Sequence, residues 1–186
     1  MNTRTRCFTS VTLLLLVCFA FACNAYEMDK ANKLINDGNA AVTEANQLFE
    51  EANSKADKIS DALSSEQYLE ESDSIKALAQ QAASGFDKSA AKYREGATKF
   101  DQASKLKLQA QLKEYLTLKT QEFSKSAEEA DIAKSIMEGG DAEAISKKIN
   151  ENRDRINQIE KEVSELAEKS KKIQQENKNI FKPESK

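Results

Sequence analysis

Apolar residues recur with a helical period through most of this chain, and few residues interrupt them. The chain has 186 residues, with five glycines and a single proline, Pro183. From Ala31 onward, a small residue opens each heptad and returns at Gly38, Ala45 and Ala52. A seven-residue apolar repeat predicts a coiled-coil helix, and small residues at its first position let a partner helix come close. The chain is therefore expected to be all-α.

Two turn signals divide this helical pattern. Ser64 and Gln67 form a candidate capping box, which would end one helix and begin another. Gly139-Gly140-Asp141 gives a helix stop followed by an N-cap. The expected helices span about 27–63, 66–137 and 141–181.

The apolar tracks of the two later helices differ in period. Between Ile75 and Tyr115 the spacing is about 3.6 residues, which predicts a straight helix. Between Ile145 and Ile180 it is about 3.5, the period of a coiled-coil seam. The seam aromatics, expected in the core rather than in a ligand site, are Phe86, Tyr93, Phe100, Tyr115 and Phe123.

One stretch inside the middle helix departs from this pattern. Apolar and polar residues alternate from Lys105 to Leu112, as they do in a strand. Because turn residues are absent around it and helical tracks flank it, the stretch is expected to stay helical.

Folding the helices back at the two turns predicts elongated antiparallel coiled-coil hairpins that share the long central helix. The alternative is a compact four-helix bundle in which the central helix breaks near Gly96 or Ser104. The expected partners are Phe49 with Ala79, Val42 with Phe86, Ile35 with Tyr93, Ile156 with Phe123, Val163 with Tyr115, and Leu166 with Leu112.

The first residues have the pattern of an export signal. Arg4 and Arg6 precede an apolar run over 11–19, and Ala20-Phe21-Ala22 ends in small residues before Cys23. We therefore expect a signal peptide over 1–22, a short tether over 23–30 and a helical domain over 31–182.

The signal and Cys23 together resemble those of small bacterial envelope lipoproteins with helical coiled-coil bodies. This resemblance implies that the Cys23 thiol is the lipid attachment site. Asn24 follows the cysteine in place of an aspartate that retains some lipoproteins at the inner membrane, so an outer-membrane location facing the periplasm is implied.

Two other interpretations of this segment stay open. Signal peptidase could cut after Ala22 or Ala25, which would release a secreted or soluble periplasmic protein. Alternatively, Cys7 to Tyr26 could remain as a membrane span, since about 20 uncharged residues suffice to cross a bilayer.

Cysteine content and charge narrow the possible partners. Cys7, Cys18 and Cys23 all lie at or before the proposed cut, so an internal disulfide is not expected in the mature chain. The full chain has a formal net charge of −3, which becomes −5 when Arg4 and Arg6 leave with the signal. A negative charge argues against nucleic acid as a partner.

The residue types needed for common catalytic and metal sites are missing. The chain has no histidine, which removes Ser-His-Asp systems and Cys/His zinc sites. Asp37-Gly38-Asn39 has Lys33 where a calcium loop needs its first carboxylate. We expect neither catalytic residues nor a bound metal or cofactor, and no enzymatic activity.

These observations predict a non-enzymatic protein of the cell envelope, anchored by lipid on Cys23, that serves as a structural spacer or interaction scaffold. Its expected partners are the membrane and proteins that meet its helix seams, including further copies of itself. The alternative is a soluble periplasmic or secreted holdase or lipid-binding module.

Overall fold

A computed structural model describes the backbone of residues 4–63 and 72–181, and the side chains of residues 26–63 and 73–181. The described part contains helices and no strand, so the expectation of an all-α fold is confirmed. Its helices are α1 (Arg4–Leu63), α2 (Ser72–Ser104), α3 (Ala110–Met137) and α4 (Ala142–Glu176).

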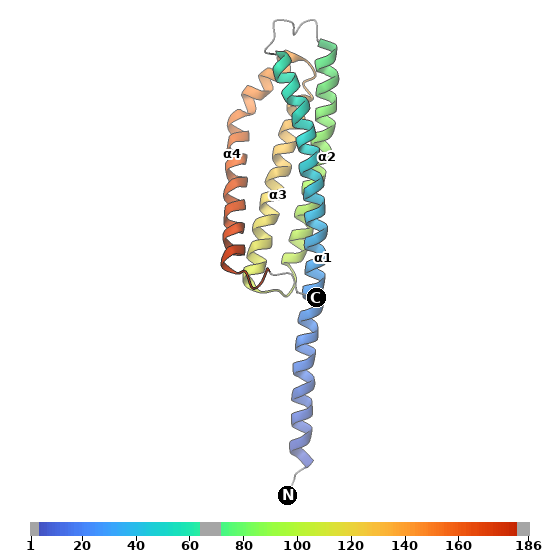
Figure 1. The fold of residues 1–186 in the computed structure, drawn as a ribbon, viewed down its shortest axis with the longest axis vertical. Coiled ribbons are helices and arrows are strands. Elements are labelled where there is room, and N and C mark those ends of the chain that lie inside the picture. Colours follow the sequence, from blue (N-terminus) through green and yellow to red (C-terminus); the bar gives the residue numbers. More distant parts are fainter. Residues whose placement is uncertain (1–3, 64–71, 182–186) are drawn as a thin grey trace.

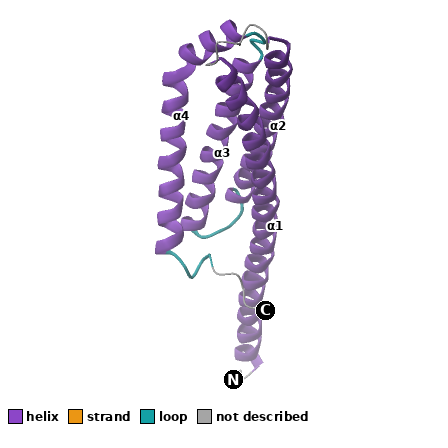
Figure 2. Cartoon of the chain, turned by 45° about the horizontal axis from the view of Figure 1, so that its top comes forward, coloured by secondary structure: helices purple, strands orange, loops and turns teal. Residues whose placement is uncertain are grey.

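The helices form an antiparallel bundle in which each packs mainly on the next one along the chain. Figure 1 shows α1 and α2 side by side, α3 beside them and α4 at the outer edge. The first part of α1 continues beyond the bundle at its lower end, where α2 meets α3 and α4 ends (Figures 1 and 2). The fold is therefore a bundle with one protruding helix.

The prediction of a single central helix over 66–137 is wrong, because residues 105–109 form a turn between α2 and α3. Alternating apolar residues cannot share one helix face, so a continued helix would turn Leu106 or Leu108 away from the core. The turn instead folds α3 back beside α2. The four-helix alternative describes the molecule, with the break after Ser104 and with Gly96 inside α2.

The seam between α1 and α2 follows the heptads expected from the sequence. Ala31, Ala45 and Ala52 are each at most 1% exposed, and Ile59 is buried beside them. The Ser89 hydroxyl of α2 donates a hydrogen bond to the Ala45 carbonyl oxygen at 2.8 Å. Small side chains thus bring the two backbones within reach of a single serine.

The predicted partners across this seam are wrong by two to three helical turns. Phe49 lies against Phe86, with ring centroids 5.3 Å apart, instead of Ala79. Val42 faces Gly96 instead of Phe86. The observed pairs place the midpoint of the hairpin about four residues further along the chain than the predicted pairs do.

The predicted register between α3 and α4 is also wrong. Leu166 lines a groove with Thr120 and Ser124 rather than meeting Leu112. The Tyr115 ring contacts Phe181, at 4.9 Å between centroids, rather than Val163. Similarly, Ile156 and Phe123 pack in different clusters. The axial offset between α3 and α4 depends on how their side chains interdigitate. Counting residues outward from the turn, as the prediction did, does not include this packing.

Two clusters of buried side chains fill the bundle, and both consist of residues from 28 to 181. All five seam aromatics belong to them, as expected. The lower cluster, nearest the protruding end, is centred on Val42, Ala45, Tyr93, Ala97, Phe100, Ala103, Leu112, Leu116, Phe123 and Ala127. The upper cluster is centred on Ala52, Ile59, Ile75, Ala79, Ala82, Ala83, Phe86, Ile136, Met137 and Ile145.

The predicted turn before the last helix is confirmed. Gly140 has a φ of +79°, a conformation that glycine adopts without strain. Asp141 is the N-cap of α4, and its carboxylate accepts a hydrogen bond from the Ala144 N–H at 2.8 Å. This turn reverses the chain so that Ile145 enters the upper cluster.

The expected tether over 23–30 is part of α1, and Met28 packs against the lower cluster. A helix forms here because the apolar and small residues before Glu27 contain no breaker. The capping-box residues Ser64 and Gln67 lie outside the described residues, as does the expected domain end at 182.

Candidate functional site

The residue with a predicted chemical role, Cys23, lies in α1, five residues before Met28 packs on the lower cluster. Its side chain, like those of Cys7 and Cys18, lies outside the described residues. The predicted signal peptide over 1–22 therefore stays a prediction. Within this segment, the backbone of residues 4–22 belongs to the protruding part of α1.

Tyr26 marks the point where the described side chains of α1 begin. Its side chain is 69% exposed. Among the large hydrophobic side chains that the structure describes, it is the one that is exposed. Two residues later, Met28 already packs on the lower cluster. The boundary between the protruding helix and the packed bundle therefore falls about one helical turn after Cys23.

The α2–α3 turn lies against this boundary. The Lys107 backbone N–H donates to a Glu27 carboxylate oxygen across 3.4 Å. Leu108 packs on the lower cluster and Leu106 is half-buried, while Lys105 and Lys107 are exposed. The Lys-Leu alternation of this stretch thus separates apolar side chains, which face the bundle, from basic ones, which face outward.

Charges at this end are partly paired. Lys105 forms an ion pair with Asp101 in the preceding turn of α2, and its side chain is still 71% exposed. Lys107 makes no ion pair within the described part of the chain. The turn therefore presents two solvated lysine side chains at the end of the bundle from which α1 emerges.

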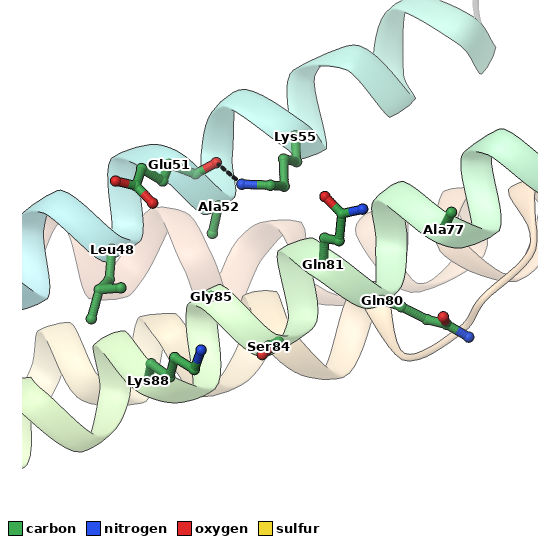
Figure 3. Close-up of a pocket in the computed structure, with 10 residues that line it drawn as sticks. All are labelled: Leu48, Glu51, Ala52, Lys55, Ala77, Gln80, Gln81, Ser84, Gly85 and Lys88. Carbon is green, nitrogen blue, oxygen red and sulfur yellow. Dashed lines mark hydrogen bonds between the residues drawn. The ribbon is translucent and has the colours of Figure 1, made fainter.

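Among the residues that the structure describes, helix side chains line several open grooves, including three between neighbouring helices. One between α1 and α2 has a volume of about 460 Å³ (Figure 3). In it, Leu48 and Ala52 of α1 face α2 near Gly85, while Lys55 donates to the Glu51 carbonyl oxygen at 3.3 Å. Glu51 is the one carboxylate that lines this groove, so the groove lacks the carboxylate pair that acid–base chemistry commonly uses.

The other two grooves are lined by ion pairs. The groove between α3 and α4, about 450 Å³, includes the pair of Lys125 with Glu162 at 2.9 Å. The groove near the upper end of α2 and α3, about 650 Å³, includes the pair of Lys134 with Asp87 at 2.7 Å. Exposed pairs of this kind contribute about 0–1 kcal/mol each, and here they line the outer surface between neighbouring helices.

Tyr93 and Glu129 are among the ionisable groups whose pKa values are shifted between the helices. Burial raises the pKa of Tyr93 to about 12, and the carboxylates of Glu129 and Glu50 add to this shift. The Tyr93 hydroxyl donates to the Asn46 side-chain oxygen at 2.6 Å. Burial also raises the pKa of Glu129, with a smaller contribution from Glu160. Glu129 lines none of the three grooves, so these shifts reflect packing between helices.

Among the side chains that the structure describes, no three acidic or sulfur ligands come together. These side chains therefore offer no candidate metal site. Over 26–63 and 73–181, no helix carries a stretch long and apolar enough to cross a membrane. The possible span from Cys7 to Tyr26 falls almost wholly outside those side chains.

No protein-family model matches the chain, and no curated protein and no solved structure gives a significant match.

The lysine turn at 105–109 is the part of this site that sequence reasoning missed. The strand-like alternation of Lys105 to Leu108 was the available signal, since it cannot form a helical apolar stripe. What the sequence could not supply is the proximity of this turn to Glu27, a residue 80 positions away in the chain.

Proposed function

We propose that the protein is a non-enzymatic component of the bacterial cell envelope, held to the outer membrane by a lipid on Cys23 and projecting into the periplasm as a helical spacer or scaffold. The observation that carries this proposal is the course of α1. Cys23 lies within this helix, which continues from it without interruption into the bundle.

This continuity supports a spacer because it replaces a flexible tether by a stiff joint. Met28 is already packed on the lower cluster, so the bundle begins about one turn after the anchor. The 33 residues of α2 span about 50 Å at 1.5 Å per residue. An upright bundle would thus reach about 50 Å from the membrane surface.

The packing favours this proposal over the soluble holdase or lipid binder. A holdase needs apolar surface, whereas Tyr26 is the large hydrophobic side chain exposed in the described part of the chain. The α1–α2 seam is filled within the chain by pairs such as Phe49 with Phe86. Partner proteins, or further copies, would therefore meet the polar outer faces of the helices.

The intact mass of the protein made in bacteria tests the anchor. We expect the mass of residues 23–186 plus that of the acyl groups, and recovery in the outer-membrane fraction. Cys23→Ser should abolish both, whereas the matched control Cys18→Ser, within the expected signal, should leave both unchanged. A mature chain that begins at Cys23 or later and carries no acyl mass would contradict the proposal.

A further inference from the structure

We propose that the 105–109 turn and the exposed Tyr26 form a membrane-contacting surface that fits the headgroups of an anionic bilayer. We call this region the basal surface. The inference rests on the proposed function in one respect, because the anchor at Cys23 sets where the membrane lies. It adds that the protein contacts lipid headgroups directly with its folded domain.

The 105–109 turn lies about as far from Cys23 along α1 as a headgroup layer is thick. The Lys107 N–H contacts the Glu27 carboxylate across 3.4 Å, which places the turn at the height of Glu27 along α1. Cys23 lies one helical turn before Glu27, about 6 Å along the axis. The headgroup layer of each leaflet is also about 6 Å thick. A bilayer whose acyl chains begin at Cys23 would therefore bring its headgroups level with the turn.

The lysine side chains of the turn give the basal surface positive charge. Lys105 and Lys107 are exposed on the turn, and Lys107 has no ion-pair partner in the described part of the chain. Asp101 pairs with Lys105, and the Glu27 carboxylate accepts the Lys107 N–H. Each lysine near an anionic surface strengthens binding roughly fivefold, within a screening length of about 8–10 Å.

An exposed aromatic side chain, that of Tyr26, lies at the same height along α1 as the turn. Tyr26 is 69% exposed, whereas the other large hydrophobic side chains of the described part are buried or half-buried. It lies on the turn of α1 between Cys23 and the packed Met28. A tyrosine ring is stable at a membrane interface, where its apolar body and its hydroxyl meet different surroundings. Solvent exposure of Tyr26 thus has a physical explanation if lipid covers it.

The test uses a chain of residues 23–186, which retains every residue of both core clusters. Its single thiol, Cys23, is coupled to a maleimide-bearing phospholipid in preformed vesicles, so anchoring does not depend on acylation in the cell. The protein has no tryptophan, so Leu106→Trp gives a unique fluorescent reporter in the turn. Leu63→Trp places the matched control at the opposite end of the bundle.

In vesicles rich in phosphatidylglycerol with brominated acyl chains, we expect strong quenching for Leu106→Trp and little for Leu63→Trp. Adding Lys105→Glu and Lys107→Glu to Leu106→Trp, or using pure phosphatidylcholine, should reduce the quenching severalfold. Lys58→Glu with Lys76→Glu, at the other end, is the charge-matched control and should change nothing. Circular dichroism checks that each variant is folded.

Equal quenching of the two tryptophan variants, or quenching of Leu106→Trp that ignores the two lysines and the lipid charge, would overturn the basal surface. The anchor is judged separately, by the intact mass of the protein made in bacteria. If the protein made in bacteria carries no acyl group while the coupled chain still shows charge-dependent quenching, the proposed anchor is refuted and the basal surface is supported.

Discussion

Replacing Gly96 with alanine tests how closely α1 and α2 approach each other. Gly96 is buried inside α2, about two turns before that helix ends, and faces α1. A Cβ atom there would lie 2.6 Å from a Val42 methyl carbon and 3.3 Å from the Gly38 carbonyl oxygen. Carbon atoms prefer a separation of about 3.5–4.0 Å, so the added methyl group overlaps its neighbour by about 1 Å.

Two opposing effects set the result. Alanine is favoured over glycine inside a helix by about 1 kcal/mol. An extra methyl group in a packed core costs about 1–3 kcal/mol. We expect the upper part of that range, because the β-branched Val42 has one strongly preferred rotamer in a helix and the Gly38 oxygen belongs to the backbone. The net prediction for Gly96→Ala is a loss of about 1–2 kcal/mol of stability.

Urea denaturation followed by circular dichroism measures this loss, and Val42→Ala supplies the second mutation of a double-mutant cycle. Val42→Ala alone should cost about 2 kcal/mol, because it removes buried methyl groups and leaves a cavity. In the double variant the new alanine at 96 fills part of that space. The coupling energy should therefore be favourable and about 2 kcal/mol.

A stabilisation of about 1 kcal/mol by Gly96→Ala would refute this reasoning, since it is the value expected from helix propensity alone. Additive effects in the double variant would refute it as well. Either result would mean that the small residues of this seam do not bring the two backbones into contact.

Three further predictions concern the turn before α4 and the half-buried carboxylate. Gly140→Ala should cost about 1–2 kcal/mol. The positive φ is the whole cause, because the added Cβ would meet no atom within 4 Å. Gly140→Asn should cost less, since asparagine tolerates this conformation better, and thermal unfolding compares the two variants. Asp141→Ala removes the cap on the Ala144 N–H and should cost about 1 kcal/mol in urea denaturation, whereas Glu143→Ala leaves the cap intact and should cost less. For Glu129, burial raises the pKa in the folded state, so its ionisation destabilises the fold as pH rises through the unfolded value and then the folded one. Glu129→Gln should therefore raise the midpoint of thermal unfolding at neutral pH but not below the ordinary glutamate pKa of about 4.3, and an equal effect at both pH values would contradict this account.

The inward faces of the helices followed directly from the sequence. The Ala31, Ala45 and Ala52 positions are buried against α2, and the last helix turns Ile145 and Ile159 inward. Helical period is a local property, so each segment encodes its own apolar face. The Gly140-Asp141 turn was equally local, because a positive φ and an N-cap each depend on one residue and its neighbours.

The proposed basal surface was only half visible in the sequence. Cys23 stands out because it ends an apolar run after two arginines, and that pattern needs no folded context. The lysine turn did not stand out, since its role depends on contact with Glu27 on another helix. An export signal is recognised as a linear segment, whereas a surface is assembled from separated ones.

The sequence by itself determined that this chain is helical, which residues face inward and where the last helix begins. Only the tertiary structure decided that the chain turns at 105–109, that Val42 meets Gly96, and that α1 enters the bundle without a tether. The physical reason is that helix period and capping act over a few residues. Stagger and chain reversal instead depend on how side chains far apart in the sequence interdigitate, and several registers satisfy the same period.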